Sequence, residues 1–204
     1  MGRRQEVARP WPAQHARERA NELAWRLEKT VALVGLMGAG KTAVGAAVAA
    51  KLGVPFVDSD QEIEKAAAMS IAEIFERDGE AFFREKEEQI LQRLMEGPPT
   101  ILSTGGGAYL REANRVAISA RGAALWLKAD LALLWSRVKH KSTRPLLRTA
   151  DPRQTLSDLL DARSPFYAKA EFVTQAEQGL SIDQMALKVI ATLAADARSG
   201  LREV

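Results

Sequence analysis

A glycine-rich segment of the 204-residue chain has residue types and a spacing that suit phosphate binding. From Gly35 to Thr42 the sequence reads GLMGAGKT, which matches the pattern G-x-x-x-x-G-K-[ST]. In such a loop the backbone N–H groups surround the phosphates, the lysine reaches the β- and γ-phosphates, and the hydroxyl binds Mg²⁺. The residues expected to contact ATP are Gly38, Ala39, Gly40, Lys41, Thr42 and Ala43.

The segments on both sides of this loop are the ones that a phosphate loop requires. Residues 30–35 form a continuous apolar, β-branched run, which predicts a buried parallel strand. Residues 41–53 form an Ala-rich helical stretch that ends at a glycine. The N-terminus of that helix adds a positive dipole end for phosphate. An accidental glycine turn is the alternative, but it would need neither the strand nor the helix.

Two carboxylates follow the second predicted strand. Asp58 and Asp60 are two residues apart, and in an extended segment such residues point the same way, so both could face one cleft. Asp58 is placed to hold Mg²⁺ through water, together with Thr42. Asp60 is placed to orient an acceptor hydroxyl and to receive its proton. The alternative is a solvated turn in which Asp60 caps the next helix.

Features missing from the sequence narrow the class of P-loop protein. The chain has no N-K-x-D segment for guanine, and the predicted strand at residues 98–103 ends without the Asp-Glu pair of a motor-type hydrolase. A small-molecule kinase, which transfers a phosphoryl group from ATP to a hydroxyl, fits what remains.

Composition excludes several other functions. There are no cysteines, which rules out disulfides and thiolate chemistry. The net charge of +3 arises from 29 basic and 26 acidic residues, too small an excess to indicate nucleic-acid binding. No apolar run approaches the roughly 20 residues of a membrane helix, and the opening residues lack the apolar region of a secretory signal. We expect a cytoplasmic protein that binds neither nucleic acid nor membrane.

Strands and helices are predicted to alternate along the chain. The expected strands cover residues 30–35, 54–58, 98–103, 122–128 and 171–175. The expected helices cover residues 41–53, 61–95, 111–120, 131–139, 155–170 and 181–198. This order predicts a parallel sheet covered on both faces, with ligands beyond the carboxyl ends of the strands.

Two segments depart from that alternation. Within the long helical region, Gly79 is expected to interrupt the helix, and Ser70 with Glu73 forms a capping-box pattern. Residues 1–29 are an extension, with a flexible tail at 1–14 and a short helix at 15–28, and residues 30–204 form a single domain.

The chain resembles shikimate kinase. Besides the phosphate loop, the segments FVDSD, GEAFFREKE, LSTGGG, STRPLL and ARSPFYAKA occur in that family's order and approximate spacing, over residues 30–192. The resemblance implies a three-layer α/β sandwich of the P-loop kinase kind, like the nucleoside-monophosphate kinases, with strand order 2-3-1-4-5 in its five-stranded parallel sheet. It also implies MgATP-dependent phosphorylation of the 3-hydroxyl of shikimate, in the pathway to aromatic amino acids, by a monomeric enzyme.

On the acceptor side, the resemblance assigns Arg84 and Arg163 to the shikimate carboxylate, and a guanidinium pairs with a carboxylate bidentately. The acceptor-binding helical segment would cover about residues 60–95, and Glu87 matches an acid near Arg84. Gly105, Gly106 and Gly107 match a turn whose backbone approaches the acceptor. From the residues alone, Arg84 could instead pair with Glu80 or Glu87 on a helix surface, Arg163 could be a helix-surface residue, and the glycines could be a flexible loop.

On the nucleotide side, the resemblance assigns Arg137 to adenine stacking and Arg144 to a lid at about residues 139–152 that closes over the phosphates. Arg144, like Lys41, would stabilise charge on the transferring group, and Ser103 would help order the water around the metal. Some family members place another arginine near adenine in the last loop. Here Gln178 is the nearest polar candidate, so that contact stays open.

Rival interpretations remain. A gluconate-kinase-like or nucleotide-kinase-like enzyme would share the phosphate loop but should lack the combined DSD, FR and GGG segments. A nucleotide-binding regulatory protein without catalysis would have no use for an acceptor-site base.

Overall fold

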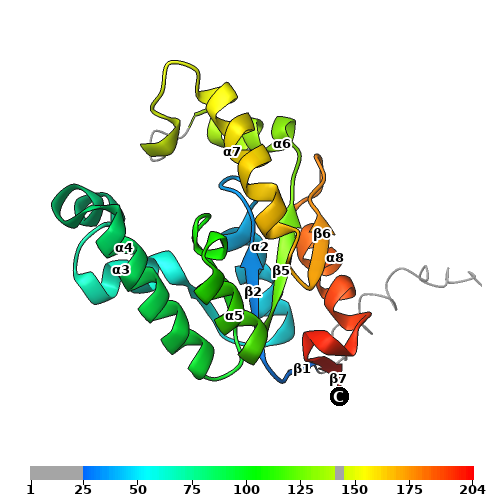
Figure 1. The fold of residues 1–204 in the computed structure, drawn as a ribbon. Coiled ribbons are helices and arrows are strands. Elements are labelled where there is room, and N and C mark those ends of the chain that lie inside the picture. Colours follow the sequence, from blue (N-terminus) through cyan, green and yellow to red (C-terminus); the bar gives the residue numbers. More distant parts are fainter. Residues whose placement is uncertain (1–24, 141–144) are drawn as a thin grey trace, which may run out of the picture.

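A five-stranded parallel sheet forms the centre of the molecule in the computed structural model, which describes residues 25–140 and 145–204 (Figure 1). The strands of this sheet are β2 (Thr30–Val34), β3 (Phe56–Asp58), β4 (Ile101–Ser103), β5 (Gly122–Lys128) and β6 (Phe172–Gln175). Their order in space is β3-β4-β2-β5-β6. Counted within this sheet alone the order is 2-3-1-4-5. The labels are higher by one because an unpredicted strand, β1, precedes them.

Helices connect the strands and cover both faces of the sheet. They are α2 (Lys41–Leu52), α3 (Ser59–Ala67), α4 (Ile71–Glu96), α5 (Glu112–Arg121), α6 (Leu131–Val138), α7 (Pro152–Tyr167) and α8 (Ile182–Ala194), with short 3-10 turns η1 (Ala108–Leu110), η2 (Pro145–Leu147) and η3 (Ala197–Ser199). Helices α2 and α8 pack side by side on one face, and α5 and α7 lie over the other (Figure 1). The expected fold class, a P-loop kinase sandwich, is confirmed.

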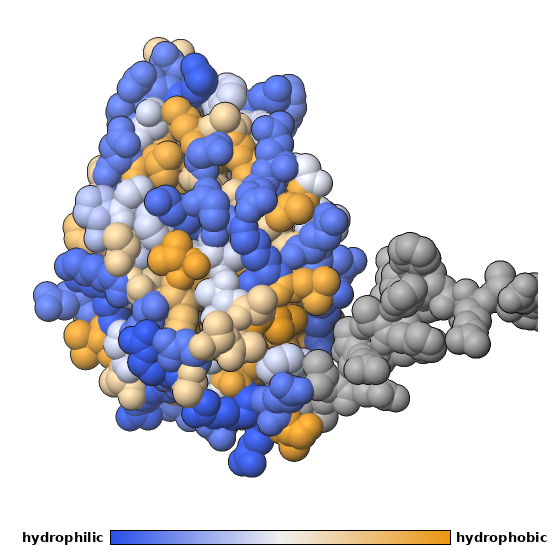
Figure 2. Space-filling view, turned by 90° about the vertical axis from the view of Figure 1, so that its right-hand side faces the viewer, coloured by the Kyte–Doolittle hydropathy of each residue, from blue (hydrophilic) through white to orange (hydrophobic). Residues whose placement is uncertain are grey.

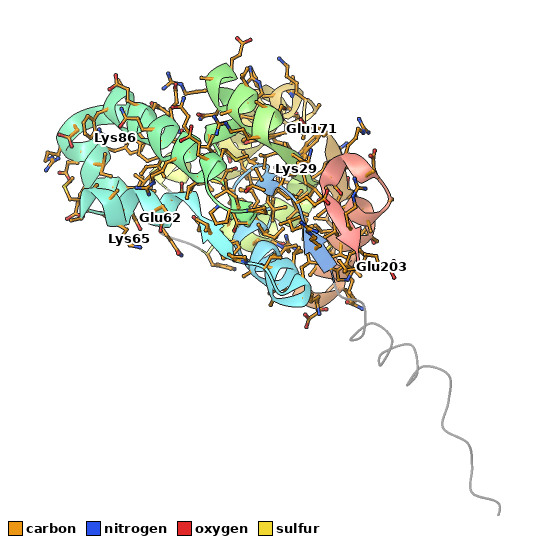
Figure 3. All side chains as sticks on the ribbon, turned by 90° about the horizontal axis from the view of Figure 1, so that it is seen from below. Lys29, Glu62, Lys65, Lys86, Glu171 and Glu203 are labelled. Carbon is orange, nitrogen blue, oxygen red and sulfur yellow. The ribbon has the colours of Figure 1, made fainter. Side chains whose placement is uncertain are left out.

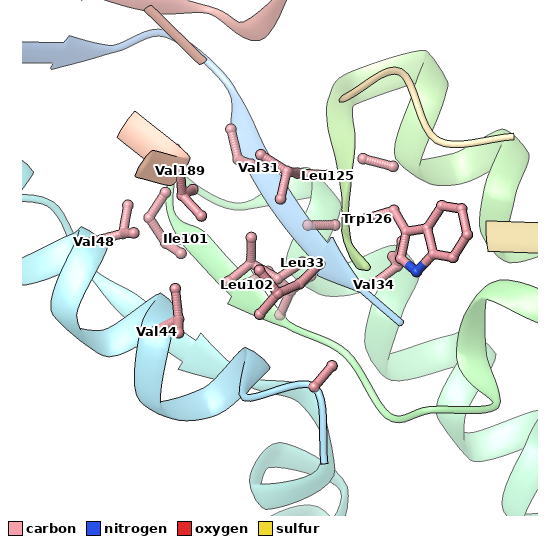
Figure 4. Close-up of a cluster of buried hydrophobic side chains, with 14 of the residues drawn as sticks. Val31, Leu33, Val34, Val44, Val48, Ile101, Leu102, Leu125, Trp126 and Val189 are labelled. Atoms are coloured by element: carbon pink, nitrogen blue, oxygen red, sulfur yellow. The ribbon is translucent and has the colours of Figure 1, made fainter. Parts of the chain in front are cut away.

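The core lies between the sheet and its helices. Leu33 of β2 pairs in register with Leu125 of β5 and faces α2, while the adjacent pair, Val34 and Trp126, points to the opposite face (Figure 4). Strand β2 is buried along its whole length because it has a neighbour on each edge and helices on each face. The central strand therefore gives the phosphate loop, which follows it directly, a rigid base.

The predicted helix at residues 15–28 is wrong where the structure describes it. Trp25–Leu27 forms strand β1, which pairs antiparallel with β7 (Leu201–Glu203) and buries Leu27 in the core. The apolar residues Leu23, Trp25 and Leu27 are spaced by two, which is the period of a strand and not of a helix. Residues 25–27 of the expected extension thus pair with the C-terminal strand of the domain, and the closing helix α8 (Ile182–Ala194) ends at residue 194 and not at 198. Residues 1–24 lie outside the described part of the chain.

The long helical region is two helices, as its sequence signals indicate. The capping box of Ser70 and Glu73 is present at the start of α4, and Gly79 kinks that helix with a φ of 82°. A small second core with Ile63 and Phe83 joins α3 to α4. Both helices project to one side of the sheet (Figure 1), and charged side chains such as Glu62, Lys65 and Lys86 extend from them (Figure 3).

On the face drawn in Figure 2, hydrophobic groups are interspersed with hydrophilic ones. Within residues 25–140 and 145–204, none of the helices combines the length and the hydropathy needed to cross a membrane.

Candidate active site

A cavity of about 530 Å³ opens at the carboxyl ends of β2, β3 and β4, where open α/β sheets bind their ligands. Four predicted groups line it: the phosphate loop, the two aspartates, the glycine turn and Arg137. The lining residues from these groups are Met37, Gly38, Gly40, Lys41, Thr42, Ala43, Asp58, Asp60, Gly105, Gly106 and Arg137. Segments far apart in the sequence thus meet at the carboxyl ends of the strands.

The phosphate loop is held in shape by its own backbone. Gly38 and Gly40 have φ values of 84° and 101°, a region that residues with a Cβ rarely adopt. The Nζ of Lys41 donates hydrogen bonds to the carbonyl oxygens of Gly35 (2.8 Å) and Leu36 (3.2 Å). The loop therefore lies at the start of α2, where the sequence pattern places a phosphate loop.

Arg137 links α6 to this loop. Its Nη1 donates to the carbonyl oxygens of Gly38 (3.2 Å) and Ala39 (2.9 Å). The guanidinium therefore lies against the phosphate loop, on the side where the resemblance expects the nucleotide.

Apolar residues that sequence reasoning missed line the same cavity. They are Leu180, Ile182 and Met185, from the start of α8 and the loop before it. In the sequence these residues read as ordinary helix packing, so only the crossing of α8 beside α2 reveals them. The polar candidate named from the sequence, Gln178, is not among the lining residues.

Oxygen atoms gather at the start of α2. The hydroxyl of Thr42 donates to Asp58 Oδ2 (2.9 Å) and lies 3.3 Å from the Oγ of Ser103. Hydroxyl and carboxylate oxygens are hard donors that suit Mg²⁺, which commonly uses one or two carboxylates together with water and phosphate. The set therefore fits Mg²⁺. Among the described residues, no group of three or more His, Cys, Asp or Glu side chains could hold a metal alone.

The geometry of the two aspartates corrects the sequence argument. Asp58, not Asp60, caps α3, because Asp58 Oδ1 accepts a hydrogen bond from the backbone N–H of Asp60 (3.0 Å). Asp60 lies in the first helical turn and not in an extended segment. Both side chains line the cavity as expected, but Asp58 does so from the end of β3 and Asp60 from the first turn of α3, so the two-residue period of a strand does not explain the pair.

Arg84 reaches the glycine turn from α4. Its Nη1 donates to Glu87 Oε2 (2.8 Å), and its Nε and Nη2 lie 3.3 and 3.2 Å from Glu80 Oε1. A Cβ on Gly107 would lie only 2.7 Å from both Nη atoms of Arg84. The helix-surface pairing considered from the sequence is thus real, yet the guanidinium also packs directly against the turn.

Glu87 is a buried acid, 1% exposed, beside this arginine. Burial raises the pKa of its carboxyl, the ion pair with Arg84 opposes that rise, and the nearby charge of Asp60 adds to it. Its Oε1 accepts no hydrogen bond from the described residues. Burial alone would lower the pKa of Arg84, but Glu87 and Glu80 raise it overall, so Arg84 stays charged.

The three glycines at 105–107 each lie against a different predicted acceptor residue. A Cβ on Gly105 would lie 2.6 Å from Asp60 Oδ1, and one on Gly107 would clash with Arg84. The carbonyl oxygen of Gly106 lies 3.5 Å from Nη1 of Arg163. The turn is therefore the point where the three side chains converge.

Arg144 lies outside the described residues, so its role in a lid stays a prediction. The part of the expected lid that is described contains the short turn η2.

The fold and the cavity together define a small-molecule kinase of the P-loop class, with a phosphate loop at one end and two arginines and an aspartate around the neighbouring turn. Comparison with known proteins narrows the class. The family model described as shikimate kinase matches residues 37–194. Since that match covers well over half of the sequence, the chain belongs to the shikimate kinase family.

Individual relatives agree with this assignment. A shikimate kinase of Ruegeria pomeroyi is 63% identical over 168 residues, which cover 82% of this chain and 86% of that protein. One of Cereibacter sphaeroides is 58% identical over 178 residues, with 87% and 89% covered. The solved structure of shikimate kinase from Acinetobacter baumannii in complex with shikimate superposes with a TM-score of 0.76 at 39% identity, over 79% of this chain and 90% of that one.

Proposed function

We propose that this chain transfers the γ-phosphoryl group of ATP to the 3-hydroxyl of shikimate, a step in the biosynthesis of aromatic amino acids. The observation that carries the proposal is the convergence of Asp60, Arg84 and Arg163 on one glycine turn, next to the cavity lined by Lys41. Membership of the shikimate kinase family gives the acceptor its identity.

The acceptor is bound through its carboxylate. Arg84 and Arg163 supply two guanidinium groups around the glycine turn, and each can donate two parallel hydrogen bonds to a carboxylate. The carboxylate of Glu87 orients Arg84 from the buried side. This grip fixes the acceptor ring so that a hydroxyl reaches Asp60.

Phosphoryl transfer then needs alignment and charge stabilisation. The acceptor oxygen forms a bond to the γ-phosphorus, the bond from that phosphorus to the bridging oxygen breaks, and ADP leaves with the electron pair. Asp60 orients the hydroxyl and receives its proton. Lys41 exchanges its bonds to the loop carbonyls for the β- and γ-phosphates and stabilises the charge there.

Thr42, Asp58 and Ser103 would hold Mg²⁺ beside the phosphates, Thr42 directly and the other two through water. When bound, the ion would neutralise negative charge on the phosphates. Chelation with EDTA should therefore abolish turnover, and added Mg²⁺ should restore it. We also propose that the enzyme is cytoplasmic and acts as a monomer. Light scattering of the purified chain would measure its molar mass in solution and so test the monomeric state.

The activity is tested by measuring ADP release from ATP with three acceptors: shikimate, gluconate and a nucleoside monophosphate. Only shikimate should stimulate release, and phosphorus NMR of the product should place the phosphate on the 3-hydroxyl. Stimulation by gluconate or the nucleotide, but not shikimate, would favour one of the rival kinases. Binding of ATP without turnover of any acceptor would favour a regulatory protein.

A further inference from the structure

A buried tyrosine that has no part in the proposed chemistry contacts the centre of the glycine turn. Tyr167, the last residue of α7, is 1% exposed, and its hydroxyl donates a 2.5 Å hydrogen bond to the carbonyl oxygen of Gly106. Nη1 of Arg163 lies 3.5 Å from the same oxygen. The Gly106 carbonyl therefore faces two donors from α7, Arg163 and Tyr167. The tyrosine hydroxyl, at 2.5 Å, is closer to it than the guanidinium, at 3.5 Å.

The position of this hydroxyl is set by the sheet. The ring of Tyr167 packs against Trp126 of β5 with centroids 6.0 Å apart, and Trp126 is paired in register with Val34 at the end of β2. Burial raises the pKa of Tyr167 to about 12, against the opposing effect of Arg163. The hydroxyl thus remains protonated, and so a donor, at neutral pH.

The second donor has another task in the proposed reaction. Arg163 is assigned to the acceptor carboxylate, and a guanidinium held tightly by a backbone carbonyl offers fewer donors to a ligand. Because Tyr167 already satisfies the Gly106 carbonyl, Arg163 can stay at the long distance of 3.5 Å. Without the tyrosine hydroxyl, that carbonyl would draw Arg163 inward, because an unsatisfied carbonyl is costly.

We propose that Tyr167 is a positioning residue for the acceptor site: its hydroxyl fixes the Gly106 carbonyl and so leaves Arg163 available for the acceptor carboxylate. This inference rests on the proposed function and adds to it a residue that acts through Arg163. Tyr167 itself does not line the cavity.

The test is the substitution Tyr167→Phe, which keeps the ring and removes only the hydroxyl. The KM for shikimate should rise about tenfold, which corresponds to about 1.4 kcal/mol, while the KM for ATP should not change. Tyr109→Phe is the matched control, since Tyr109 is equally buried but is not the tyrosine that donates to the Gly106 carbonyl. That variant should keep both KM values.

A double-mutant cycle distinguishes a role of Tyr167 in positioning Arg163 from a role in stabilising the fold alone. If Tyr167 acts through Arg163, Tyr167→Phe should raise the shikimate KM far less in an Arg163→Ala background than in the wild-type background. Assays are run below the unfolding temperature of each variant. A lower melting temperature with an unchanged shikimate KM, or equal effects in both backgrounds, would overturn the inference.

The same data distinguish failure of this inference from failure of the proposed function. A wild-type enzyme without shikimate-dependent ADP release would remove the proposed function, and the positioning role with it. An active wild-type enzyme whose shikimate KM is unaffected by Tyr167→Phe would remove only the role of Tyr167.

Discussion

The two ends of the active site are built in different ways. The phosphate cradle comes from one continuous segment, residues 35–43, and its lysine is hydrogen-bonded to carbonyls of that same segment. The acceptor end has no such segment, because its side chains come from α3, α4 and α7 and meet only at the glycine turn after β4. Backbone groups dominate the first region, and charged side chains dominate the second.

This difference indicates that the acceptor end, and not the phosphate cradle, determines the substrate specificity of the enzyme. A backbone cradle binds any polyphosphate of suitable shape, and its strand-loop-helix setting makes it independent of the rest of the chain. The acceptor end depends on how three helices are placed, and a small shift of any of them changes the grip. Substitutions at the acceptor end should therefore alter the shikimate kinetics and leave ATP binding intact.

Asp60→Asn should have the largest effect of the changes considered. The amide cannot receive the hydroxyl proton, so turnover should fall roughly 10²-fold or more, the usual scale for proton-transfer groups. ATP binding, followed by equilibrium dialysis, should be nearly unchanged. Asp161→Asn, at an exposed position on α7, serves as control. Near-normal turnover of Asp60→Asn would remove Asp60 from the mechanism.

Arg84→Ala should have the second-largest effect, and this effect should be confined to binding of the acceptor. The substitution removes the guanidinium that pairs with the shikimate carboxylate, and the loss of one partner from such a charge pair weakens binding strongly. The KM for shikimate should therefore rise about 30-fold or more, while the KM for ATP should not change. Arg77→Ala is the matched control, because Arg77 lies on the same helix but pairs with Asp78 at the surface. An isolated rise in the ATP KM would contradict the division between the two ends.

Gly107→Ala tests the close packing of the turn. The backbone at Gly107 has a φ of −95°, which any residue can adopt, so the substitution strains only the contact with Arg84. The added methyl group should displace the guanidinium and raise the shikimate KM about tenfold, a change of about 1.4 kcal/mol. Gly97→Ala, where φ is also negative but an added Cβ would lie near Leu94 and not near Arg84, should have no such effect. Unchanged shikimate kinetics would place Arg84 outside the grip.

Glu87→Gln should give the smallest effect, a change in how stability depends on pH. Burial raises the pKa of Glu87 above its ordinary value of 4.5, so the folded state binds this proton more tightly than the unfolded state. The contribution of Glu87 to the unfolding free energy is therefore full below pH 4.5 and is lost as pH rises through the folded pKa. Urea unfolding from pH 4.5 upward should show wild-type stability falling relative to Glu87→Gln. A constant difference would contradict the raised pKa.

The phosphate cradle could be predicted from the sequence, while the acceptor end could be predicted only in part. The geometry of the loop follows from its glycine positions and its flanking strand and helix, so the sequence predicts that Lys41 and Thr42 lie together, and both line the cavity. For Arg84 the residues alone allowed a surface ion pair, and only family resemblance pointed to the acceptor, because no local pattern reveals that α4 passes beside Gly107.

Other features were missed for the same physical reason. Tyr167 and the cavity residue Met185 depend on contacts between distant segments. At the N-terminus, strand β1 pairs with β7, about 175 residues later, so tertiary pairing overrode the helix assigned to that segment. Asp58 and Asp60 line the cavity as predicted, but Asp60 does so from the first turn of α3, which the strand argument did not predict.

The most direct test of the two-ended site is a crystal structure of the chain with shikimate, Mg²⁺ and a non-hydrolysable ATP analogue. We expect the carboxylate of shikimate between Arg84 and Arg163, its 3-hydroxyl at Asp60, and the γ-phosphate at Lys41. Shikimate bound with its carboxylate away from both arginines, or with its 3-hydroxyl out of reach of Asp60, would contradict the account.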